Sequence, residues 1–385
     1  MDRRSFLKVG LAGAAVTTSA STRKYRAAVI GHTSHGDYGH GLDVVWRAFD
    51  SVDIVAVADP DDDGRAKAVK RTGAKRDYRD YREMLHKEKP DLVSISPRWP
   101  DERVAMVTAA AEAGAHIYLE KPLARDLVEA DKIVQAVERS KVKLQVAHEM
   151  RCSPAALKVR EMLRAGEIGA LQELRTRGKE DRRAGGEDLM VLGSHTCMLM
   201  RMFLGDPDWV FAHVTHDGEE ISRRHVGKAA EPIGPIAGNQ IAAMFAFDDG
   251  VHGYFGSKAN DQTHRKRWGM YFYGTKGVIY VPNGIDFPPY ILRTPAWMPD
   301  EQHHWERIDL TAHMRTDIKA EGRQLANARM VQDLMEAIER DREPACNARD
   351  GRWSVEMIVA IYESQRTGSR VEFPLGDRRH PLTRL

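Results

Sequence analysis

The stretch Ala113–Leu123, reading AGAHIYLEKPL, decides how the first half of the chain is interpreted. Its apolar run His116–Leu119 is short and follows a glycine, which is typical of a buried parallel strand. Glu120-Lys121-Pro122 ends the run, and the apolar periodicity of 126–138 indicates a helix. A charged pair therefore lies at the carboxyl end of a strand, where open α/β sheets bind ligands. A solvated ion pair is the simpler interpretation of these three residues alone, so the rest of the chain decides.

Strands and helices alternate through the first 150 residues. Short apolar runs indicate strands at Tyr25–Ile30, Val52–Ala58, Leu92–Ser96, His116–Leu119 and Lys143–Ala147. Helical periodicity lies between them, most clearly at Arg103–Ala113 and Asp126–Glu138. Alternation of this kind predicts a doubly wound parallel sheet of the Rossmann type. We therefore expect residues 24–147 to form one dinucleotide-binding domain.

The glycine-rich segment after the first strand, residues 31–41, reads GHTSHGDYGHG. A dinucleotide-binding loop follows G-x-G-x-x-G, so that backbone N–H groups and a helix start meet the pyrophosphate. Gly31 and Gly36 fit this frame, and Thr33 replaces the middle glycine, where its hydroxyl can still donate to a phosphate. Asp59 lies 28 residues after Gly31, at the end of the second strand. It either binds the adenosine ribose and repels a 2′-phosphate, which favours NAD over NADP, or caps the next helix, or does both.

The first 20 residues are typical of an export signal. DRRSFLK at 2–8 is basic, and Val9–Ala20 is rich in Gly and Ala and carries no charge. Arg3-Arg4 followed by Phe6-Leu7-Lys8 resembles the twin-arginine signal, which carries folded proteins across the bacterial inner membrane. Twelve uncharged residues are too few to span a bilayer, which needs about 20. We therefore expect a signal peptide over 1–20, recognition by the twin-arginine translocase, and a periplasmic or exported protein.

Composition excludes several classes of function. Removal of residues 1–20 takes away three basic residues and one acidic residue, leaving 55 of each sign, so no net charge favours nucleic acid or an anionic membrane. The cysteines at 152, 197 and 346 form neither a disulfide framework nor a zinc pattern. The histidines at 213, 216, 303, 304 and 313 lack a paired ligand set, so we expect no metal. A chain of this length favours two domains.

The second half is predicted to form an α+β domain around a mainly antiparallel, open sheet. Strands are indicated at Leu171–Arg177, Val210–Thr215, Gln240–Phe247, Val251–Ser257, Met270–Tyr273 and Val278–Val281. The last two form a hairpin about Gly274–Gly277. Helices are expected at Ala155–Ala165, after the loop that begins at Gly185, at Arg323–Arg340 and at Trp353–Gln365. Arg223–Gly238 and Pro282–Met314 show no pattern, and residues 376–385 are assigned to a tail.

These motifs together resemble the Gfo/Idh/MocA oxidoreductase family, which includes glucose–fructose oxidoreductase and inositol dehydrogenase. The resemblance spans residues 24 to about 375. Besides the glycine loop it rests on Val57-Ala58-Asp59, Ile95-Ser96-Pro97, Glu120-Lys121-Pro122, Ser153-Pro154, Gly166–Gly169 and Tyr362–Ser364. It implies an NAD(P)-dependent oxidoreductase of a sugar, glycoside or polyol. It also implies a substrate domain over 148–375 whose open sheet forms homo-oligomers.

The resemblance implies two catalytic residues. Lys121 is expected beside the nicotinamide as the proton-handling group, with Glu120 lining the cofactor or orienting Lys121. The family's second catalytic element is a histidine in an Asp-x-Gly-x-His pattern, which Val191–His195 matches at His195. Valine replaces the aspartate, and Met198 stands where many members carry an acid. Glu187 and Asp188 lie near enough in the sequence to polarise His195 in their place.

The remaining site residues follow from the same resemblance. Cofactor contacts are expected from Gly31, Thr33, Gly36, Asp59, Ser96, Pro97, Trp99, Glu120 and Lys121, and substrate contacts from His148, Glu149, Arg151, Glu187 and Asp188. Trp99 either stacks on the nicotinamide or substrate, or packs beneath its loop. Three functions stay open: an exported dehydrogenase with tightly bound NAD, a glycoside hydrolase that uses transient oxidation, and a non-enzymatic NAD-containing sensor or scaffold. The missing acids at 191 and 198 lend weight to the last, but the retention of both Lys121 and His195 argues against it and favours the dehydrogenase.

Overall fold

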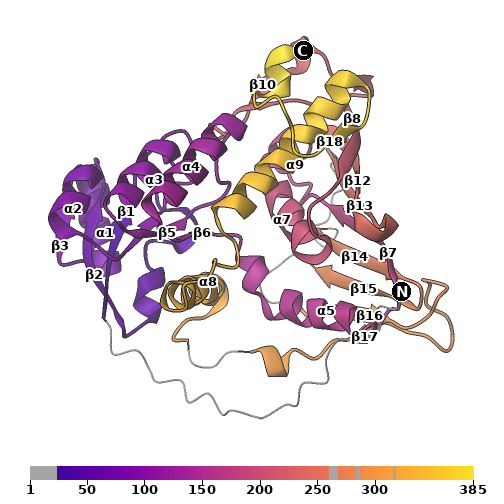
Figure 1. Ribbon diagram of the computed structural model, residues 1–385, viewed down its shortest axis with the longest axis horizontal. Coiled ribbons are helices and arrows are strands. Elements are labelled where there is room, and N and C mark those ends of the chain that lie inside the picture. Colours follow the sequence, from indigo (N-terminus) through magenta and orange to yellow (C-terminus); the bar gives the residue numbers. More distant parts are fainter. Residues whose placement is uncertain (1–23, 260–267, 283–286, 315–317) are drawn as a thin grey trace, which may run out of the picture.

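The computed structural model describes residues 24–259, 268–282, 287–314 and 318–385, and the predicted export signal lies outside these ranges. A parallel sheet and its helices occupy one side of the molecule, and a larger mixed sheet occupies the other (Figure 1). Helix α9, Ala348–Thr367, lies between them and contacts both α4 of the first domain and β8 of the second. None of the described helices is both long and apolar enough to cross a membrane.

The first sheet has six parallel strands in the order β3-β2-β1-β4-β5-β6. Their bounds are β1 Tyr25–Ile30, β2 Val52–Ala58, β3 Arg76–Tyr78, β4 Leu92–Ile95, β5 His116–Leu119 and β6 Leu144–Val146. This order confirms the doubly wound sheet. The sequence did not reveal β3, because an edge strand of three polar or partly exposed residues carries no apolar run. The order reverses between β1 and β4, so the loops after these strands border the ligand crevice.

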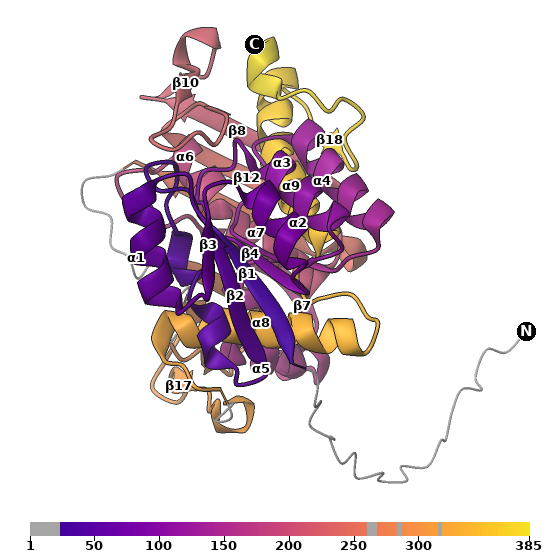
Figure 2. The same cartoon turned by 90° about the vertical axis from the view of Figure 1, so that its left-hand side faces the viewer.

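Helices cover both faces of the parallel sheet. Figure 2 shows α1, Asp62–Thr72, on one side, with α3, Arg103–Glu112, and α4, Leu127–Ser140, on the other. Helix α2 is Tyr81–Glu88. The chain after β1 forms no α-helix; it makes only two short 3-10 turns, Gly39–Gly41 and Val45–Ala48. The usual helix start beneath the glycine loop is therefore missing, a difference from the Rossmann pattern that bears on the site.

The second sheet has ten strands, in the order β17-β16-β15-β14-β7-β13-β12-β8-β18, with β9 paired to β8. Their bounds are β7 Leu171–Arg177, β8 Trp209–His216, β9 Glu219–Glu220, β12 Gln240–Ala246, β13 His252–Lys258, β14 Gly269–Gly274, β15 Gly277–Pro282, β16 Tyr290–Leu292, β17 Glu306–Arg307 and β18 Val371–Glu372. Within this second sheet, only β7 and β13 pair in parallel among the described strands. The prediction of a mainly antiparallel sheet is therefore confirmed. The two segments without a sequence pattern contribute β16 and β17 and a separate ribbon, β10 Gly227–Lys228 with β11 Pro235–Ile236.

Two of the five described helices of the second half, α8 (Gly322–Glu339) and α9, contact elements of the first domain. The other three are α5 Pro154–Arg164, α6 Gly186–Val191 and α7 Gly193–Leu204. Although α8 belongs to the C-terminal part of the chain, it packs on the first sheet. Asn327 of α8 accepts a hydrogen bond from the Tyr118 hydroxyl (2.9 Å), and Gln145 of β6 donates to the carbonyl oxygen of Met330 (3.0 Å). The site between the domains is therefore closed by α8 as well as by α7.

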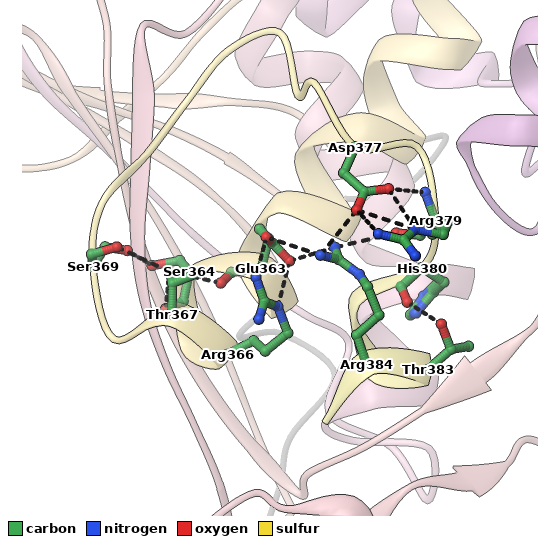
Figure 3. Close-up of polar contacts among 10 residues, drawn as sticks. All are labelled: Glu363, Ser364, Arg366, Thr367, Ser369, Asp377, Arg379, His380, Thr383 and Arg384. Atoms are coloured by element: carbon green, nitrogen blue, oxygen red, sulfur yellow. Dashed lines mark hydrogen bonds and ion pairs between the residues drawn. The ribbon is translucent and has the colours of Figure 1, made fainter.

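The last ten residues fold back on α9, although the sequence left them as a tail. Glu363 of α9 accepts hydrogen bonds from Arg366 and Arg384, each over 2.7 Å (Figure 3). Arg384 also pairs with Asp377 at 3.2 Å, and Leu382 is buried. This end of the chain is therefore packed as part of the second domain.

Candidate active site

Lys121 and His195 line the same cavity between the two domains, as the sequence predicted. Lys121 follows β5, and His195 lies in the first turn of α7. Both side chains are buried, and the cavity has a volume of about 140 Å³. Lys121 Nζ donates to the backbone carbonyl oxygen of Val191 over 3.3 Å, which joins the end of β5 to the end of α6.

A buried arginine holds the loops that carry the site. Arg103, at the start of α3, donates to the carbonyl oxygens of Pro97 (2.7 Å) and Pro122. Pro97 follows β4 and Pro122 follows Lys121 after β5. One guanidinium therefore ties the loop after β4 to the loop that carries Lys121. Burial lowers the pKa of Arg103 to about 10, which leaves it charged at neutral pH. The sequence offered no signal for this role, because the residue looks like an ordinary helix start.

Burial lowers the pKa of Lys121, because an ammonium loses its hydration in the cavity. The carboxylates of Glu120, Glu149 and Glu231 oppose this shift without reversing it. His40 Nδ1 donates to Glu120 over 2.9 Å. Burial alone would raise the pKa of Glu120, but His40, Lys121 and Arg103 together hold it below its ordinary value. Glu120 is therefore an ionised neighbour of a lysine that gives up its proton more readily than usual.

His195 contacts His148 and Glu149. Its Nδ1 lies 3.4 Å from Nδ1 of His148 and 4.0 Å from a carboxylate oxygen of Glu149, and the two rings meet edge to face. Burial lowers the pKa of His195 well below 6.5, and the nearby His148 and Lys121 lower it further. The ring is therefore neutral at pH 7. Burial also raises the pKa of Glu149. The acid beside His195 is therefore Glu149, which comes from the turn after β6.

The prediction that Glu187 or Asp188 polarises His195 is wrong, because both carboxylates bind other groups of the chain, whereas their contact with a substrate stays a prediction. The Asp188 carboxylate accepts from the Ser257 hydroxyl (2.6 Å) and from the backbone N–H of Glu180 (3.1 Å). Glu187 accepts from the backbone N–H of Ala230 at 3.4 Å. Neither side chain lines the cavity. Their partners belong to other segments of the chain, which spacing along the sequence does not reveal.

Arg151 also lies outside this cavity, contrary to the expected substrate contact. Its guanidinium pairs with Asp350 at 3.4 Å and donates to the sulfur of Met198 at 2.9 Å. It lines a separate cavity of about 540 Å³. Met198, which replaces an acid of the family pattern, is therefore a contact of Arg151 and not of His195.

Asp59 is fully buried at the end of β2, where it holds the glycine-rich segment 31–41. It accepts from the backbone N–H of Thr33 (3.1 Å), from the Thr33 hydroxyl (2.7 Å) and from the backbone N–H of Asp61 (3.0 Å). Asp61 caps α1 through Gly64 (2.7 Å), so the capping role considered for Asp59 belongs to Asp61. The Thr33 hydroxyl donates to Asp59. A ribose-binding role of Asp59 stays a prediction.

The glycine-rich segment 31–41 lies against the loop after β4. Gly39 N–H donates to the carbonyl oxygen of Ser96 (2.7 Å), and Arg98 N–H donates to that of Gly36 (3.0 Å). A Cβ on Gly36, whose φ is +84°, would meet the backbone of Arg98 and Trp99, so only glycine allows this approach. Trp99 itself packs edge to face on His35, with ring centroids 4.6 Å apart.

The residues present fit a dinucleotide at its nicotinamide end. Ser96 Oγ and one oxygen of Glu120 are buried and have no partner within the described ranges, so a polar ligand group can satisfy them. Asp59 has the position of the ribose-binding acid, but both of its oxygens accept bonds from Thr33 or Asp61, so a ribose has to replace one of these bonds. The phosphate end differs, because the backbone N–H groups of residues 32–35, 37 and 39 are all paired within the chain. A pyrophosphate therefore has to replace some of these bonds.

The sequence did not identify most residues around the cavity. The wall includes His40, Arg98, Lys179, Arg183, Glu231, Trp268, Arg323 and Asn327. Most come from distant segments without a motif, and the fold brings them together with His40 of the glycine-rich segment and with Arg98, which follows Ser96-Pro97. Trp268 Nε1 and His148 Nε2 are buried polar atoms without a partner in the part of the chain that the structure describes. The cavity therefore presents polar groups to a small hydroxylated molecule.

A Rossmann sheet, an acid after β2, a buried lysine after β5 and a histidine from a mixed-sheet domain define a two-domain, nicotinamide-dependent type of oxidoreductase. The chain belongs to the GFO/IDH/MocA family. The family's NAD-binding Rossmann-fold domain matches residues 25–148, and a GFO/IDH/MocA C-terminal domain matches residues 156–280.

Curated relatives include sugar and polyol dehydrogenases. D-apiose dehydrogenase of Paraburkholderia graminis is 35% identical over 152 residues, which are 40% of each chain. Myo-inositol 2-dehydrogenase of Thermotoga maritima is 22% identical over 66% of this chain and 73% of its own. D-xylose 1-dehydrogenase (NADP(+)) 2 of Haloferax volcanii is 25% identical over 81% and 89%. For the apiose enzyme and two other curated relatives, the matched part is between 40% and 52% of their length.

Solved structures show the same fold. Levoglucosan dehydrogenase in complex with NADH and levoglucosan superposes with a TM-score of 0.74, covering 92% of this chain and 100% of that one at 19% identity. An Agrobacterium radiobacter oxidoreductase in complex with NAD+, L-tartaric acid and magnesium gives 0.70, covering 91% and 98% at 19% identity. Both domains of the chain therefore have the arrangement of these proteins.

Proposed function

We propose that the protein is an NAD(P)-dependent oxidoreductase that acts on a CH–OH group of a sugar, glycoside or polyol. The observation that carries this proposal is the pairing of Lys121 with His195 in one buried cavity, each with a pKa below its ordinary value. The lowered pKa values favour the unprotonated forms of both groups, and the oxidation of an alcohol needs an unprotonated group nearby because the hydroxyl proton must leave as the hydride does. Sugar and polyol dehydrogenases among the relatives support the same class.

The chain's own residues divide the work. The nicotinamide, when bound, supplies the hydride acceptor or donor. Lys121, held by the Val191 carbonyl, takes the hydroxyl proton at Nζ. His195, neutral and placed against His148, hydrogen-bonds the same hydroxyl and orients it. Glu120 keeps a negative charge beside Lys121 and so limits the fall of its pKa.

The proposed cofactor is NAD, held tightly, with NADP disfavoured. Asp59 carries this preference, because a carboxylate accepts from ribose hydroxyls and repels a 2′-phosphate. Tight binding is supported by the bonds between segment 31–41 and residues 96–98, which bring the two sides of the crevice together. Gly31, Thr33, Gly36, Ser96, Pro97 and Glu120 complete the proposed cofactor contacts.

Within that substrate class, the cavity favours a molecule with a negative group such as a carboxylate. Arg98 and Arg323 line it, and neither side chain has an acidic partner among the described residues. Arg183 and Lys179 share a single acid, Asp181, at 2.6 and 3.5 Å. This surplus of cations attracts an anionic group to one end of the substrate while Lys121 and His195 act at the other.

The test is a substrate panel on the purified full chain, in which the absorbance of reduced nicotinamide is recorded. The panel pairs each neutral sugar or polyol with its sugar acid, and each glycoside with its free sugar. Substrate-dependent reduction of the cofactor, larger for the acids, supports the proposal. If every compound leaves the cofactor unchanged in wild type while the cofactor binds, the sensor or scaffold function replaces it.

One observation favours a second candidate, cleavage of a glycoside through transient oxidation. Glu149 is a half-buried carboxylic acid with a raised pKa close to His195, as a general acid for a leaving sugar requires. Product analysis separates the two functions. A hydrolase releases a free sugar with no net change in cofactor, whereas a dehydrogenase accumulates the oxidised product.

We also propose export through the twin-arginine pathway to the periplasm, on the basis of residues 1–20. Homo-oligomers through the second sheet are a further proposal. The open face of that sheet forms a hollow of about 700 Å³ lined by Phe211, Tyr254, Tyr271 and Tyr273, and Phe211 is 46% exposed. Aromatic surface of this kind is typical of protein interfaces. Light scattering of wild type and Phe211→Glu tests it, since a monomeric wild type contradicts the proposal.

A further inference from the structure

Two histidines of the glycine-rich segment and two acids of the loop after β4 meet at the mouth of the crevice. His32 and His35 belong to the turn after β1, and Asp101 and Glu102 come directly before α3. The turn is tight, because the N–H groups of His35 and Asp37 both donate to the carbonyl oxygen of His32 over 3.0 Å. The two imidazole rings therefore lie together, with centroids 4.7 Å apart.

The distances are short enough for one ion. Potential ligand atoms of His32, His35 and Glu102 all lie within 4.8 Å of one another. His32 Nδ1 is 3.1 Å from Glu102 Oε2, and His35 Nε2 is 2.9 Å from the Asp101 carboxylate. Zinc bonds of roughly 2.0–2.2 Å separate tetrahedral ligand atoms by about 3.4 Å, so small side-chain rotations complete the site. In the described ranges no other such group of three occurs.

The chemistry of the cluster selects a transition metal. Two imidazoles and one carboxylate form a known zinc ligand set that leaves a fourth position for water. Asp101 contacts His35 as a carboxylate does when it orients a metal-ligating histidine. The carboxylates of Asp101 and Glu102 make the space beside the two imidazoles attractive to a cation. The sequence predicted no metal, since the two acids lie 66 or more residues from the histidines and form no motif with them.

We propose that His32, His35 and Glu102 bind one divalent transition-metal ion of the zinc type, with Asp101 as the orienting residue. The ion links segment 31–41 to the start of α3, beside the backbone bond between Arg98 and Gly36. It thereby braces the two loops that border the crevice. The inference does not depend on the proposed reaction, because none of these four residues lines the cavity of Lys121 and His195.

The test is Zn²⁺ binding to the full chain, prepared without a histidine tag and stripped with a chelator. Competition with a chromophoric chelator measures the affinity, and Co²⁺ in place of Zn²⁺ reports tetrahedral coordination through its visible spectrum. We expect one Zn²⁺ per chain. The double variant His32→Gln/His35→Gln should lose it, and Asp101→Asn should weaken it by about 10–100-fold.

Two further variants keep the test decisive. His303→Gln removes a histidine that also pairs with an acid, Asp300 at 2.9 Å, but belongs to no three-ligand group, so Zn²⁺ binding should be unchanged. Glu102→Gln preserves shape, and Glu102 makes no capping bond at α3, so this variant should fold and bind Zn²⁺ at least about 10-fold more weakly. Equal affinity in wild type, the double variant and Glu102→Gln overturns the proposal.

Discussion

Lys121 donates its hydrogen bond to the main chain of Val191, at 3.3 Å, the residue that stands where the family pattern has an aspartate. A main-chain carbonyl accepts whatever the side chain is, so the change to valine does not remove the partner of Lys121. What the change removes is a negative charge at that position. The remaining charges that favour the ammonium are Glu120, Glu149 and Glu231, and they do not offset the cost of burial. The carbonyl dipole of Val191 therefore positions Lys121, and the ammonium loses its proton more easily than an exposed lysine does.

Lys121→Met should lower turnover by about 10²-fold or more, because the variant keeps most of the side-chain volume and loses the proton-accepting group. Cofactor binding should change little. Steady-state rates with the substrate found in the panel are the measurement. Lys132→Met, at an exposed position of α4, is the matched control and should be fully active. Full activity of Lys121→Met would show that this lysine has no role in the chemistry.

His148 should make the protein less stable in mild acid. Burial lowers its pKa to about 3, whereas the unfolded chain protonates it near 6.5. Between these values the unfolded state binds more protons, so the free energy of unfolding increases with pH, by up to about 1.4 kcal/mol per pH unit for one group. His148→Gln should flatten this slope. Urea unfolding at several pH values between 4 and 7 measures it, in roughly the window set by these pKa values.

The control for His148 is His303→Gln, which removes an exposed histidine. Its plot of unfolding free energy against pH should run parallel to that of wild type. His195 is also buried and has a lowered pKa. The His148 variant should therefore retain part of the increase of unfolding free energy with pH. Parallel curves for wild type and His148→Gln would contradict the assignment.

The sequence predicted the elements whose burial leaves an apolar pattern. Strands β1, β2, β4 and β5 are nearly continuous apolar runs, and α4 has apolar residues at helical spacing on one face. Both patterns can be recognised in the sequence. The β3 edge strand has no such pattern. The 3-10 turns after β1 were not predicted, because the glycines of segment 31–41 have the spacing of a dinucleotide-binding motif, which a helix usually follows. The type of an element was therefore predictable where burial requires apolar residues at a regular spacing. It was not predictable where a few hydrogen bonds within one loop determine the backbone conformation.

The site could be predicted in part, for a similar reason. Lys121 and His195 sit in motifs, and the structure brings them to one cavity. Glu149 was named only as a substrate contact, because its proximity to His195 depends on how the turn after β6 meets α7. His40 had no signal at all, since its bond to Glu120 joins residues 80 positions apart. Contacts between distant segments arise from the packing of two domains, and no local pattern encodes them.

Asp59→Ser should narrow the preference for NAD over NADP, since it removes both the ribose acceptor and the repulsion of a 2′-phosphate. The affinities for the two cofactors, measured by titration calorimetry, give the ratio. The structure calls for a control, because Asp59 also holds the backbone and hydroxyl of Thr33. Thr33→Val loses only the hydroxyl bond and should leave the ratio unchanged. An unmutated protein that binds both cofactors equally contradicts the role of Asp59.

Export should depend on Arg3 and Arg4 together. The double variant Arg3→Lys/Arg4→Lys keeps the positive charge and should still remain in the cytoplasm, because the twin-arginine route recognises the pair and not the charge. Cell fractionation followed by immunoblotting measures the distribution. Lys8→Arg preserves the pair and should be exported normally. Normal export of the double variant would rule out this route.

The last prediction joins the proposed compartment to the geometry of the crevice. No ready pool of free NAD exists outside the inner membrane, so a working enzyme there must keep its cofactor and return the hydride within each cycle. The bonds that Gly36 and Gly39 make with Arg98 and Ser96 hold together the loops on the two sides of this crevice. We therefore expect the purified protein to carry nicotinamide without any being added, and to show ping-pong kinetics with a sugar donor and a carbonyl acceptor.

A glycine variant tests whether the contacts between segment 31–41 and residues 96–98 retain the cofactor. A Cβ on Gly39 would lie 2.5 Å from Arg98 Cγ and 3.1 Å from Glu120 Cδ, so Gly39→Ala forces segment 31–41 away from residues 96–98. Its bound cofactor should exchange faster with added labelled NAD than in wild type. Gly376→Ala, where a Cβ meets nothing within 4 Å, is the control. Wild-type protein that is purified without cofactor, and that releases NADH in proportion to the substrate consumed, would show that the cofactor behaves as an ordinary diffusible substrate, and the crevice contacts would then have no part in retaining it.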